Sequence, residues 1–121
     1  MKTNRILSEC NFKHPMILIT EDGHLSISGN SISVRPEDSF VPLIRWLTAY
    51  KGEILNIDIN LNIVSCRSLK LLLQAIIAAD LNTEIKNKSI TWFFEDKEEE
   101  EIGEMISSNV KDSKFSLFSK N

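Results

Sequence analysis

Isoleucine or leucine alternates strictly with polar residues from residue 57 to 63, in the segment IDINLNI. Successive side chains of a β-strand point to opposite faces, so the apolar residues would share one face, and Asp58, Asn60 and Asn62 the other. A strand between two helix layers would be apolar on both faces. The pattern therefore predicts a sheet that helices cover mainly on one face.

Apolar residues at helical spacing predict three helices. The first begins between Pro36 and Pro42 and ends near residues 50–52, where Gly52 is suited to a left-handed C-cap. The second begins after Ser65, a common N-cap residue. The third follows the acidic run at residues 95–101, because clustered carboxylates stabilise a helix N-terminus. The inner stripe predicted for the second helix comprises Leu69, Leu72, Leu73, Ile76 and Ile77.

The remaining strands follow from short apolar or alternating runs. Residues 16–20 and 24–28 flank a Glu-Asp-Gly turn and predict a β-hairpin. Residues 82–88 form a polar connector, and residues 89–94 and 115–118 predict the last two strands. The fold class expected is α/β: a single-domain, mixed β-sheet with about five strands and three helices mainly on one face. We expect one domain over residues 1–121, with its core at about 14–118.

Composition narrows the class of protein. The 121 residues are 42% hydrophobic and 26% charged, which is typical of one globular domain. A net charge of −3 gives no electrostatic reason to expect nucleic acid or an anionic membrane as a partner. No apolar run resembles a membrane span or a signal peptide, and two cysteines do not make a disulfide framework. We therefore expect a cytoplasmic protein with no nucleic-acid or membrane partner.

Enzyme motifs are missing from the sequence. The four glycines form no phosphate-binding loop, and no motif assigns His14 or His24 to a nucleophile. The acidic run at 95–101 lacks the spaced ligands of a metal site, so a solvated helix N-terminus is the better interpretation. The sequence predicts a protein that is not an enzyme, with no catalytic residue, cofactor or metal.

The segment VSCRSLKLLL at residues 64–73 carries the candidate chemistry. Plain N-capping by Ser65 is the simplest interpretation. Free backbone N–H groups and the helix dipole also stabilise negative charge, so the fold would tolerate phosphorylation of Ser65 or Ser68. A thiol near a helix N-terminus has a lowered pKa, so Cys66 supports a third interpretation as a redox-sensing interaction module.

Three segments, taken together, carry a resemblance to a known family. They are GHLSISGNS followed by PLIRWLTAY, then VSCRSLKLLLQAI, then SITWFFEDKEEEEIGE. Their order and spacing resemble the SiaC-type regulatory phosphoproteins of bacteria, relatives in architecture of the STAS-domain anti-sigma-factor antagonists. The resemblance extends from about His14 to Phe118, and it implies a STAS-like fold.

The resemblance implies a function as well as a fold. Members of this family are non-enzymatic switches that a dedicated kinase phosphorylates and a PP2C-like phosphatase dephosphorylates. The unmodified form binds and activates a diguanylate cyclase, which connects the switch to cyclic-di-GMP and biofilm formation. A STAS-like anti-sigma-factor antagonist, with a different protein partner, stays open as an alternative.

This chain departs from the family at the modified segment, which reads Asn-Thr-Ser-Ser-x-Lys in the family. With Lys70 as the anchor, Ser65 takes the Asn position and Cys66 that of the acceptor Thr, while Arg67 and Ser68 take the two Ser positions. The resemblance thus implies a switch at Ser65, Cys66 or Ser68. A cation at Arg67 could also replace the charge that a kinase controls, which would make partner binding constitutive.

The expected docking region combines the helix start with the polar strand face. It comprises the surface of residues 65–70, where Arg67 and Lys70 carry positive charge, and the side chains of Asp58, Asn60 and Asn62. We expect Ser68→Asp to weaken partner binding while lowering the free energy of unfolding by no more than about 1 kcal/mol.

Overall fold

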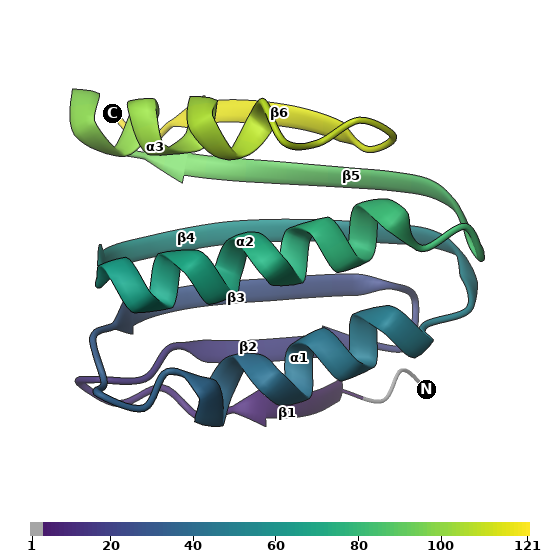
Figure 1. Ribbon diagram of the computed structural model, residues 1–121, viewed down its shortest axis with the longest axis horizontal. Helices are drawn as coiled ribbons and strands as arrows, with labels where there is room; N and C mark the ends of the chain where they lie inside the picture. Colours follow the sequence, from purple (N-terminus) through teal and green to yellow (C-terminus); the bar gives the residue numbers. More distant parts are fainter. Residues whose placement is uncertain (1–3) are drawn as a thin grey trace.

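The computed structural model describes residues 4–121, so residues 1–3 of the expected domain lie outside the described part. One sheet carries three helices, all on the same face (Figure 1). The elements, in chain order, are β1 (Asn4–Ser8), β2 (Met16–Thr20), β3 (His24–Ser31), α1 (Glu37–Ala49), β4 (Gly52–Val64), α2 (Cys66–Leu81), β5 (Ile85–Phe94), α3 (Lys97–Ser107) and β6 (Lys114–Ser119).

The strands lie in the sheet in the same order as in the chain, from β1 to β6. β1, β2 and β3 pair antiparallel, whereas β3 to β6 are parallel and are joined by one helix at each crossover. The predicted mixed α/β sheet with helices on one face is confirmed, but it has six strands instead of about five. The missed strand is β1, whose sequence NRILS does not alternate between apolar and polar residues.

The alternation along β4 has the predicted consequence. Asp58, Asn60 and Asn62 lie on the helix-free face and are exposed or half-exposed. Ile63 departs from the pattern and is 55% exposed. The register between β3 and β4 shifts just before Ile63: Gly29 pairs with Leu61 but Asn30 pairs with Ile63, so Asn62 is an extra residue of β4. The buried residues of β4 are Leu55, Ile57, Ile59 and Leu61.

One predicted cap and one predicted boundary are wrong. Helix α1 ends at Ala49 with Tyr50 as its C-cap, close to the predicted residues 50–52, but the backbone of Tyr50 is extended and Gly52 begins β4 without a left-handed conformation. The left-handed glycines among the described residues are Gly23, in the predicted hairpin turn, and Gly29, at the register shift of β3. Residues 82–88 are only partly a connector, because β5 begins at Ile85.

The inner face of α2 differs from the predicted stripe. Leu72 and Ile76 are buried as predicted, whereas Leu69, Leu73 and Ile77 are half-buried on the flanks of the helix. The helix packs against α1 as well as against the sheet, which turns a different set of residues inward. The remaining buried residues of α2 are Ser68, Ala75, Ala79 and Asp80.

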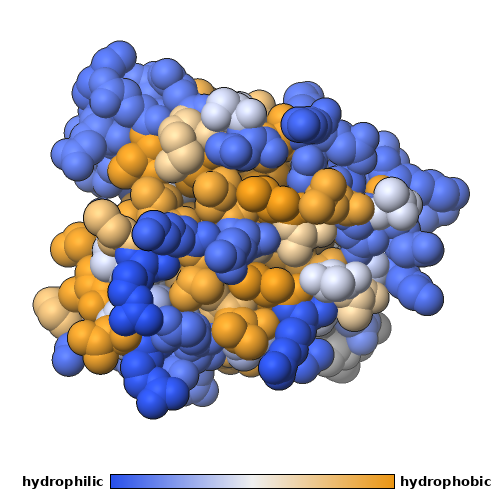
Figure 2. Space-filling view, in the orientation of Figure 1, coloured by the Kyte–Doolittle hydropathy of each residue, from blue (hydrophilic) through white to orange (hydrophobic). Residues whose placement is uncertain are grey.

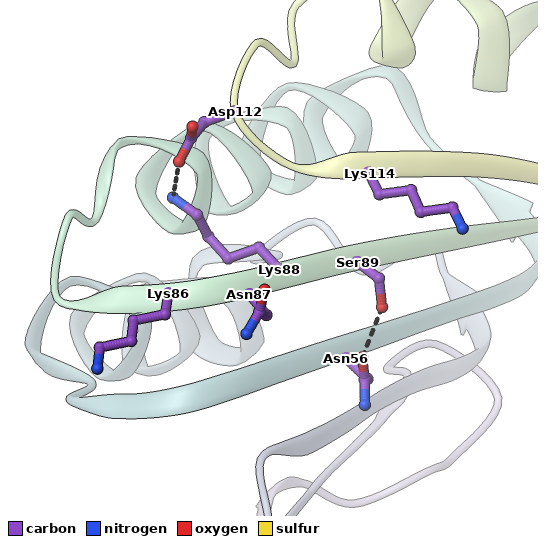
Figure 3. A pocket seen from close by; sticks show the side chains of 7 residues that line it. All are labelled: Asn56, Lys86, Asn87, Lys88, Ser89, Asp112 and Lys114. Carbon is purple, nitrogen blue, oxygen red and sulfur yellow. Dashed lines mark hydrogen bonds and ion pairs between the residues drawn. The ribbon is translucent and has the colours of Figure 1, made fainter.

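A buried lysine closes the C-terminal end of α2. Lys88 lies in β5, and its Nζ donates to the carbonyl oxygens of Ala79 (3.2 Å), Asp80 (2.6 Å) and Asn82 (3.1 Å). The same amine forms an ion pair of 3.0 Å with Asp112 in the α3–β6 connection (Figure 3). Free carbonyls at a helix C-terminus favour a cation, so Lys88 caps the helix and joins it to β5.

The carboxylate of Asp80 fixes the same connection from the helix side. It accepts hydrogen bonds from the backbone N–H groups of Lys111, Asp112 and Ser113, and from the Ser113 hydroxyl. Burial raises the pKa of Asp80, but these hydrogen bonds lower it more, so its pKa lies below the ordinary value of 3.8. Across residues 4–121, no helix is both long and apolar enough to span a membrane.

Candidate functional site

The turn at residues 65–70 lies where β4 passes into α2, at the end of the sheet drawn on the left in Figure 1. Ser65 is the N-cap that the sequence predicted: its backbone is extended, and its Oγ accepts from the N–H of Ser68 at 3.1 Å. The N–H of Ser65 donates to the carbonyl of Ser31 at 2.9 Å. The start of α2 is therefore held by its own cap and by the end of β3.

Three serine hydroxyls form a chain behind this turn. Ser31 donates to the Oγ of Ser68 at 2.8 Å, and Ser65 donates to the same oxygen at 3.0 Å. Ser68 is 0% exposed, whereas Ser65 is half-buried. An enzyme can reach Ser65 more readily than Ser68, which becomes accessible only if the first turn of α2 opens. The role of Ser31 was missed, because its partner is distant in sequence.

Arg67 joins the 65–70 turn to the connection between β3 and α1. Its guanidinium donates to the carbonyl of Val34 at 3.0 Å and forms an ion pair of 2.6 Å with Glu37 at the start of α1. The Arg67 side chain is 66% exposed. Cys66 and Lys70 are exposed beside it, and Cys66 is a free thiol. The turn thus presents a thiol and two cations to solvent, and one cation is already paired.

Of the polar residues of β4, some lie near this turn and others lie far from it. The carboxylate of Asp58 lies 3.1 Å from Nε2 of His24, and Asn60 accepts from Lys120 at 2.9 Å. At a rise of 3.3 Å per residue, Asp58 lies about 23 Å from Ser65 along the strand. Asn62 is exposed close to the turn. The structure therefore brings Asn62 to the helix start and leaves Asp58 far along the helix-free face.

Exposed apolar residues gather at this end of the sheet, and sequence reasoning missed them. Phe12, Val34 and Ile63 are 74%, 81% and 55% exposed. The carbonyl of Phe12 accepts from Asn30, which pairs with Ile63, and the carbonyl of Val34 accepts from Arg67. Exposed apolar residues that lie near one another within polar surroundings are a feature of many protein interaction surfaces. The signal in the sequence was weak: single apolar residues within polar loops.

A shallow acidic hollow adjoins the turn on its other side. It encloses about 220 Å³ between the end of β4 and the start of α3. Asp96 caps α3 by accepting from the N–H of Glu99 at 2.8 Å, and the carboxylate of Glu99 accepts from the N–H of Glu95 at 2.6 Å. These acids organise a helix N-terminus, as the sequence predicted. The residues lining the hollow are Asn62, Ile63, Val64, Asp96, Glu98, Glu99 and Ile102.

The outer surface of the helix layer extends the apolar area away from the turn. Figure 2 shows apolar residues across the middle of this face, over α2, with hydrophilic residues gathered around α3. The half-buried apolar residues of α2 include Leu69, Leu73 and Ile77, and Leu69 belongs to the 65–70 turn. The turn is therefore one end of a longer, partly apolar surface.

One serine–histidine pair deserves comparison with a catalytic site. His14 Nδ1 lies 3.2 Å from the Oγ of Ser39, which also bonds Ser8 at 2.9 Å. Ser39 is 2% exposed. A nucleophile needs an accessible oxygen, whereas the Ser39 hydroxyl is buried and joins α1 to Ser8 of β1.

A second polar hollow lies at the opposite end of the sheet and encloses about 330 Å³ (Figure 3). Its lining includes Asn56 and Ser89, which bond each other at 2.6 Å, and the amine of Lys88, which three carbonyls and Asp112 already engage. These groups are held by neighbours in the fold.

The fold and the exposed 65–70 turn define a small α/β domain that presents hydroxyl, thiol and charged groups at the start of α2. The chain belongs to the SiaC family of regulatory phosphoproteins, which it matches over residues 9–120. The predicted family is thereby confirmed. A search of curated proteins gave no significant match.

Solved structures of Pseudomonas aeruginosa SiaC share this fold. Apo-SiaC superposes with a TM-score of 0.81 at 17% identity, over 96% of this chain and 98% of that one. A second SiaC structure gives 0.79 at 18% identity, over 97% and 98%. A match of 0.76 at 18% identity, over 91% and 95%, comes from the crystal structure of the diguanylate cyclase SiaD in complex with its activator SiaC.

Proposed function

We propose that this chain is a non-enzymatic signalling switch that docks to a diguanylate cyclase and is controlled by phosphorylation at the start of α2. Two findings support the proposal: the chain belongs to a family of regulatory phosphoproteins, and a P. aeruginosa protein of the same fold is the activator of the diguanylate cyclase SiaD. The observation that carries it here is the exposed turn at residues 65–70 with apolar residues around it.

The proposed docking surface is the end of the sheet that bears this turn. Arg67, Lys70 and Asn62 supply its polar groups, and Val34 and Ile63 supply apolar contact area. Interfaces commonly combine an apolar centre with a polar rim. Asp58 and Asn60 lie too far along β4 for the same contact, so only a partner that also covers the helix-free face would reach them.

Ser65 is the acceptor that the geometry favours. Cys66 stands at the family's acceptor position, but its side chain is a thiol and forms no phosphate ester of the same stability. A phosphate on Ser65 would add −1.5 to −2 charges beside the free N–H groups at the start of α2. It would also remove the proton that Ser65 donates to Ser68. A kinase and a PP2C-like phosphatase would act on this exposed turn, whereas Ser68 requires prior opening of the helix.

Reconstitution with the diguanylate cyclase of the same organism tests this function. We expect the unmodified chain to raise cyclic-di-GMP synthesis and Ser65→Asp to lower that activation at least tenfold. Thr83→Asp places the same charge at the exposed far end of α2 and should leave activation unchanged. Full activation by Ser65→Asp would contradict control at this turn, and recovery of an anti-sigma kinase from native lysate would favour the anti-sigma-factor antagonist.

The exposure of Cys66 supports a second candidate, a redox-sensing interaction module. Thiol titration of the folded chain tests it, with Cys10→Ser to remove the other exposed thiol. A redox sensor requires Cys66 to react clearly faster in the folded chain than in denaturant. Equal or slower reaction would remove this candidate and leave the phosphorylation switch.

A further inference from the structure

We infer that Arg67 transmits charge at the start of α2 to the β3–α1 connection, so that one modification changes the docking surface in two places. The inference rests on the proposed function in one respect, because it takes Ser65 as the residue where negative charge is introduced. The contacts of Arg67 carry the argument. Arg67 stands where the family motif has serine, so the coupling belongs to this chain.

The connection at residues 32–36 is anchored at its start, by local contacts and by Arg67. Its first two residues, Ile32 and Ser33, donate their N–H groups to the carbonyl of Lys13 at 2.9 and 3.2 Å. Local contacts follow at Arg35, whose N–H donates to the Ser33 Oγ at 3.0 Å and whose carbonyl accepts from the N–H of Asp38 at 3.2 Å. The contact with α2 comes from the guanidinium of Arg67, which holds the carbonyl of Val34 at 3.0 Å and the carboxylate of Glu37 at 2.6 Å. Arg67 therefore fixes the middle of the connection to the turn that contains Ser65.

The free energies of these contacts favour a change of partner by Arg67, from Glu37 to a negative charge at Ser65. Both side chains of the Arg67–Glu37 pair are substantially exposed, at 66% and 41%, and exposed ion pairs contribute only about 0.2–1 kcal/mol. A phosphate forms charge-assisted, often bidentate hydrogen bonds with arginine that are roughly twice as strong as neutral ones. Negative charge at Ser65 would attract Arg67 and repel the Glu37 carboxylate. Both effects weaken the contacts that hold the connection.

The consequence reaches the docking surface through Val34. This residue is 81% exposed and lies in the middle of the connection, with its carbonyl bonded to Arg67. When Arg67 turns toward a charge at Ser65, the Val34 backbone loses that hydrogen bond and the connection becomes more mobile. A partner that contacts the Val34 side chain therefore senses the modification without touching Ser65. The partner chemistry that fits is an apolar side chain placed over Val34.

Amide hydrogen exchange in the isolated chain tests this coupling. Ser65→Asp and Ser65→Asn are a matched pair, because both residues are good N-caps and only one is charged. We expect the backbone amides of residues 33–35 and 37 (residue 36 is proline and has no amide hydrogen) to exchange about two- to fivefold faster in Ser65→Asp than in Ser65→Asn, the factors that loss of contacts worth about 0.5–1 kcal/mol gives. Equal rates in the two variants would overturn the inference.

Removal of the arginine supplies the second test. In Arg67→Gln the same amides should already exchange faster than in the unmodified chain, and adding Ser65→Asp should have no further effect. Lys70→Gln removes the other exposed cation of the turn and should leave the rates unchanged. Unchanged exchange in Arg67→Gln would show that Arg67 does not hold the connection and would overturn the inference.

The outcome is separable from the proposed function, because neither kinase nor cyclase is present in these measurements. Fast exchange in Ser65→Asp combined with full cyclase activation would retain the coupling and reject control at the turn. Slow exchange combined with loss of activation would retain control at the turn and reject the coupling through Arg67.

Discussion

The two ends of α2 are built in opposite ways. At the C-terminal end the side chain of Lys88 is 2% exposed and bonds three carbonyls, while the Asp80 carboxylate, in a residue 6% exposed, accepts three backbone N–H groups. At the N-terminal end Cys66, Arg67 and Lys70 are exposed, and Arg67 is held by an exposed ion pair. One end is fixed by buried charge, and the other can change its partners.

This difference suits a protein that signals through its surface. Buried charged hydrogen bonds contribute about 1.5–3 kcal/mol each, whereas an exposed ion pair contributes up to about 1 kcal/mol. Rearrangement at the start of α2 therefore leaves the anchoring of the helix at Lys88 intact. The inner side of the start of α2 is the exception, because Ser68 is as buried as the core.

The largest expected effect comes from comparing Ser68→Asp with Ser65→Asp. Ser68 is 0% exposed, so a carboxylate there would lose its hydration and disrupt the bonds to Ser31 and Ser65. We expect Ser68→Asp to lower the free energy of unfolding by more than about 3 kcal/mol. Ser65→Asp keeps an N-cap and should change it by less than about 0.5 kcal/mol. Urea denaturation measures both.

From the sequence alone, Ser68→Asp was expected to lower the free energy of unfolding by no more than about 1 kcal/mol. Because Ser68 is buried, the expected loss is larger. Equal stability of the two variants would mean that the first turn of α2 is open in solution. In that case Ser68 would be as accessible as Ser65, and the contrast between the inner and outer sides of the turn would fail.

Lys88→Met should have the next largest effect. Methionine fills similar space but leaves the carbonyls of Ala79, Asp80 and Asn82 without their charged donor. We expect a loss of about 2–3 kcal/mol in the free energy of unfolding, with cyclase activation retained at temperatures where the variant is folded. Lys86→Met is the control, because Lys86 is 75% exposed and its ion pair within residues 4–121 is with the exposed Glu53. A loss below that of the control would show that the C-terminal end of α2 is not fixed by Lys88.

Asp80 makes the stability of the same end depend on pH. Its pKa in the folded chain lies below the ordinary value of 3.8, because its four hydrogen bonds outweigh burial. The unfolded chain therefore takes up the proton first as the pH falls, and the stabilisation by Asp80 is complete above 3.8 and is lost through the lower, folded pKa.

The variant Asp80→Asn tests the direction of this pH dependence. We expect it to cost about 2 kcal/mol at neutral pH, since the carboxylate accepts several hydrogen bonds. Unfolding free energies measured from pH 7 downward should differ by a constant amount at first and then converge below about pH 4. A difference that grows on acidification would contradict the lowered pKa.

The sequence predicted the fold correctly where the buried residues recur at the regular spacing of a strand or a helix. The alternation at residues 57–63 identified β4 and its open face, and Ser65 was recognised as an N-cap from its position before an apolar stripe. The exposure of Ile63 follows from the register shift between β3 and β4, where Asn62 is an extra residue of β4, and β1 pairs with β2. Such features depend on contacts between strands, which a period in one segment does not encode.

The candidate site was predictable only in its position. The turn at residues 65–70 follows from capping chemistry and from the family resemblance. The separation of its side chains into a buried Ser68 and an exposed Arg67 follows from partners in β3 and α1, about 30 or more residues away in the chain. Likewise, Lys88 lay in a polar connector by sequence, yet its amine ends beneath the last turn of α2.

The smallest expected effect measures how weakly the start of α2 is held. A double-mutant cycle with Arg67→Gln and Glu37→Gln should give a coupling free energy of about 0.5 kcal/mol, because both side chains are exposed. The coupling should fall further at about 1 M salt, where charges are screened within a few ångströms. Urea denaturation at low and high salt provides the values, and Lys88→Met should show a loss that salt hardly changes.

A salt-independent coupling above about 2 kcal/mol would place the Arg67 contact in the class of buried charge pairs. The two ends of α2 would then be equally fixed, and Arg67 could not exchange its partners on modification of Ser65.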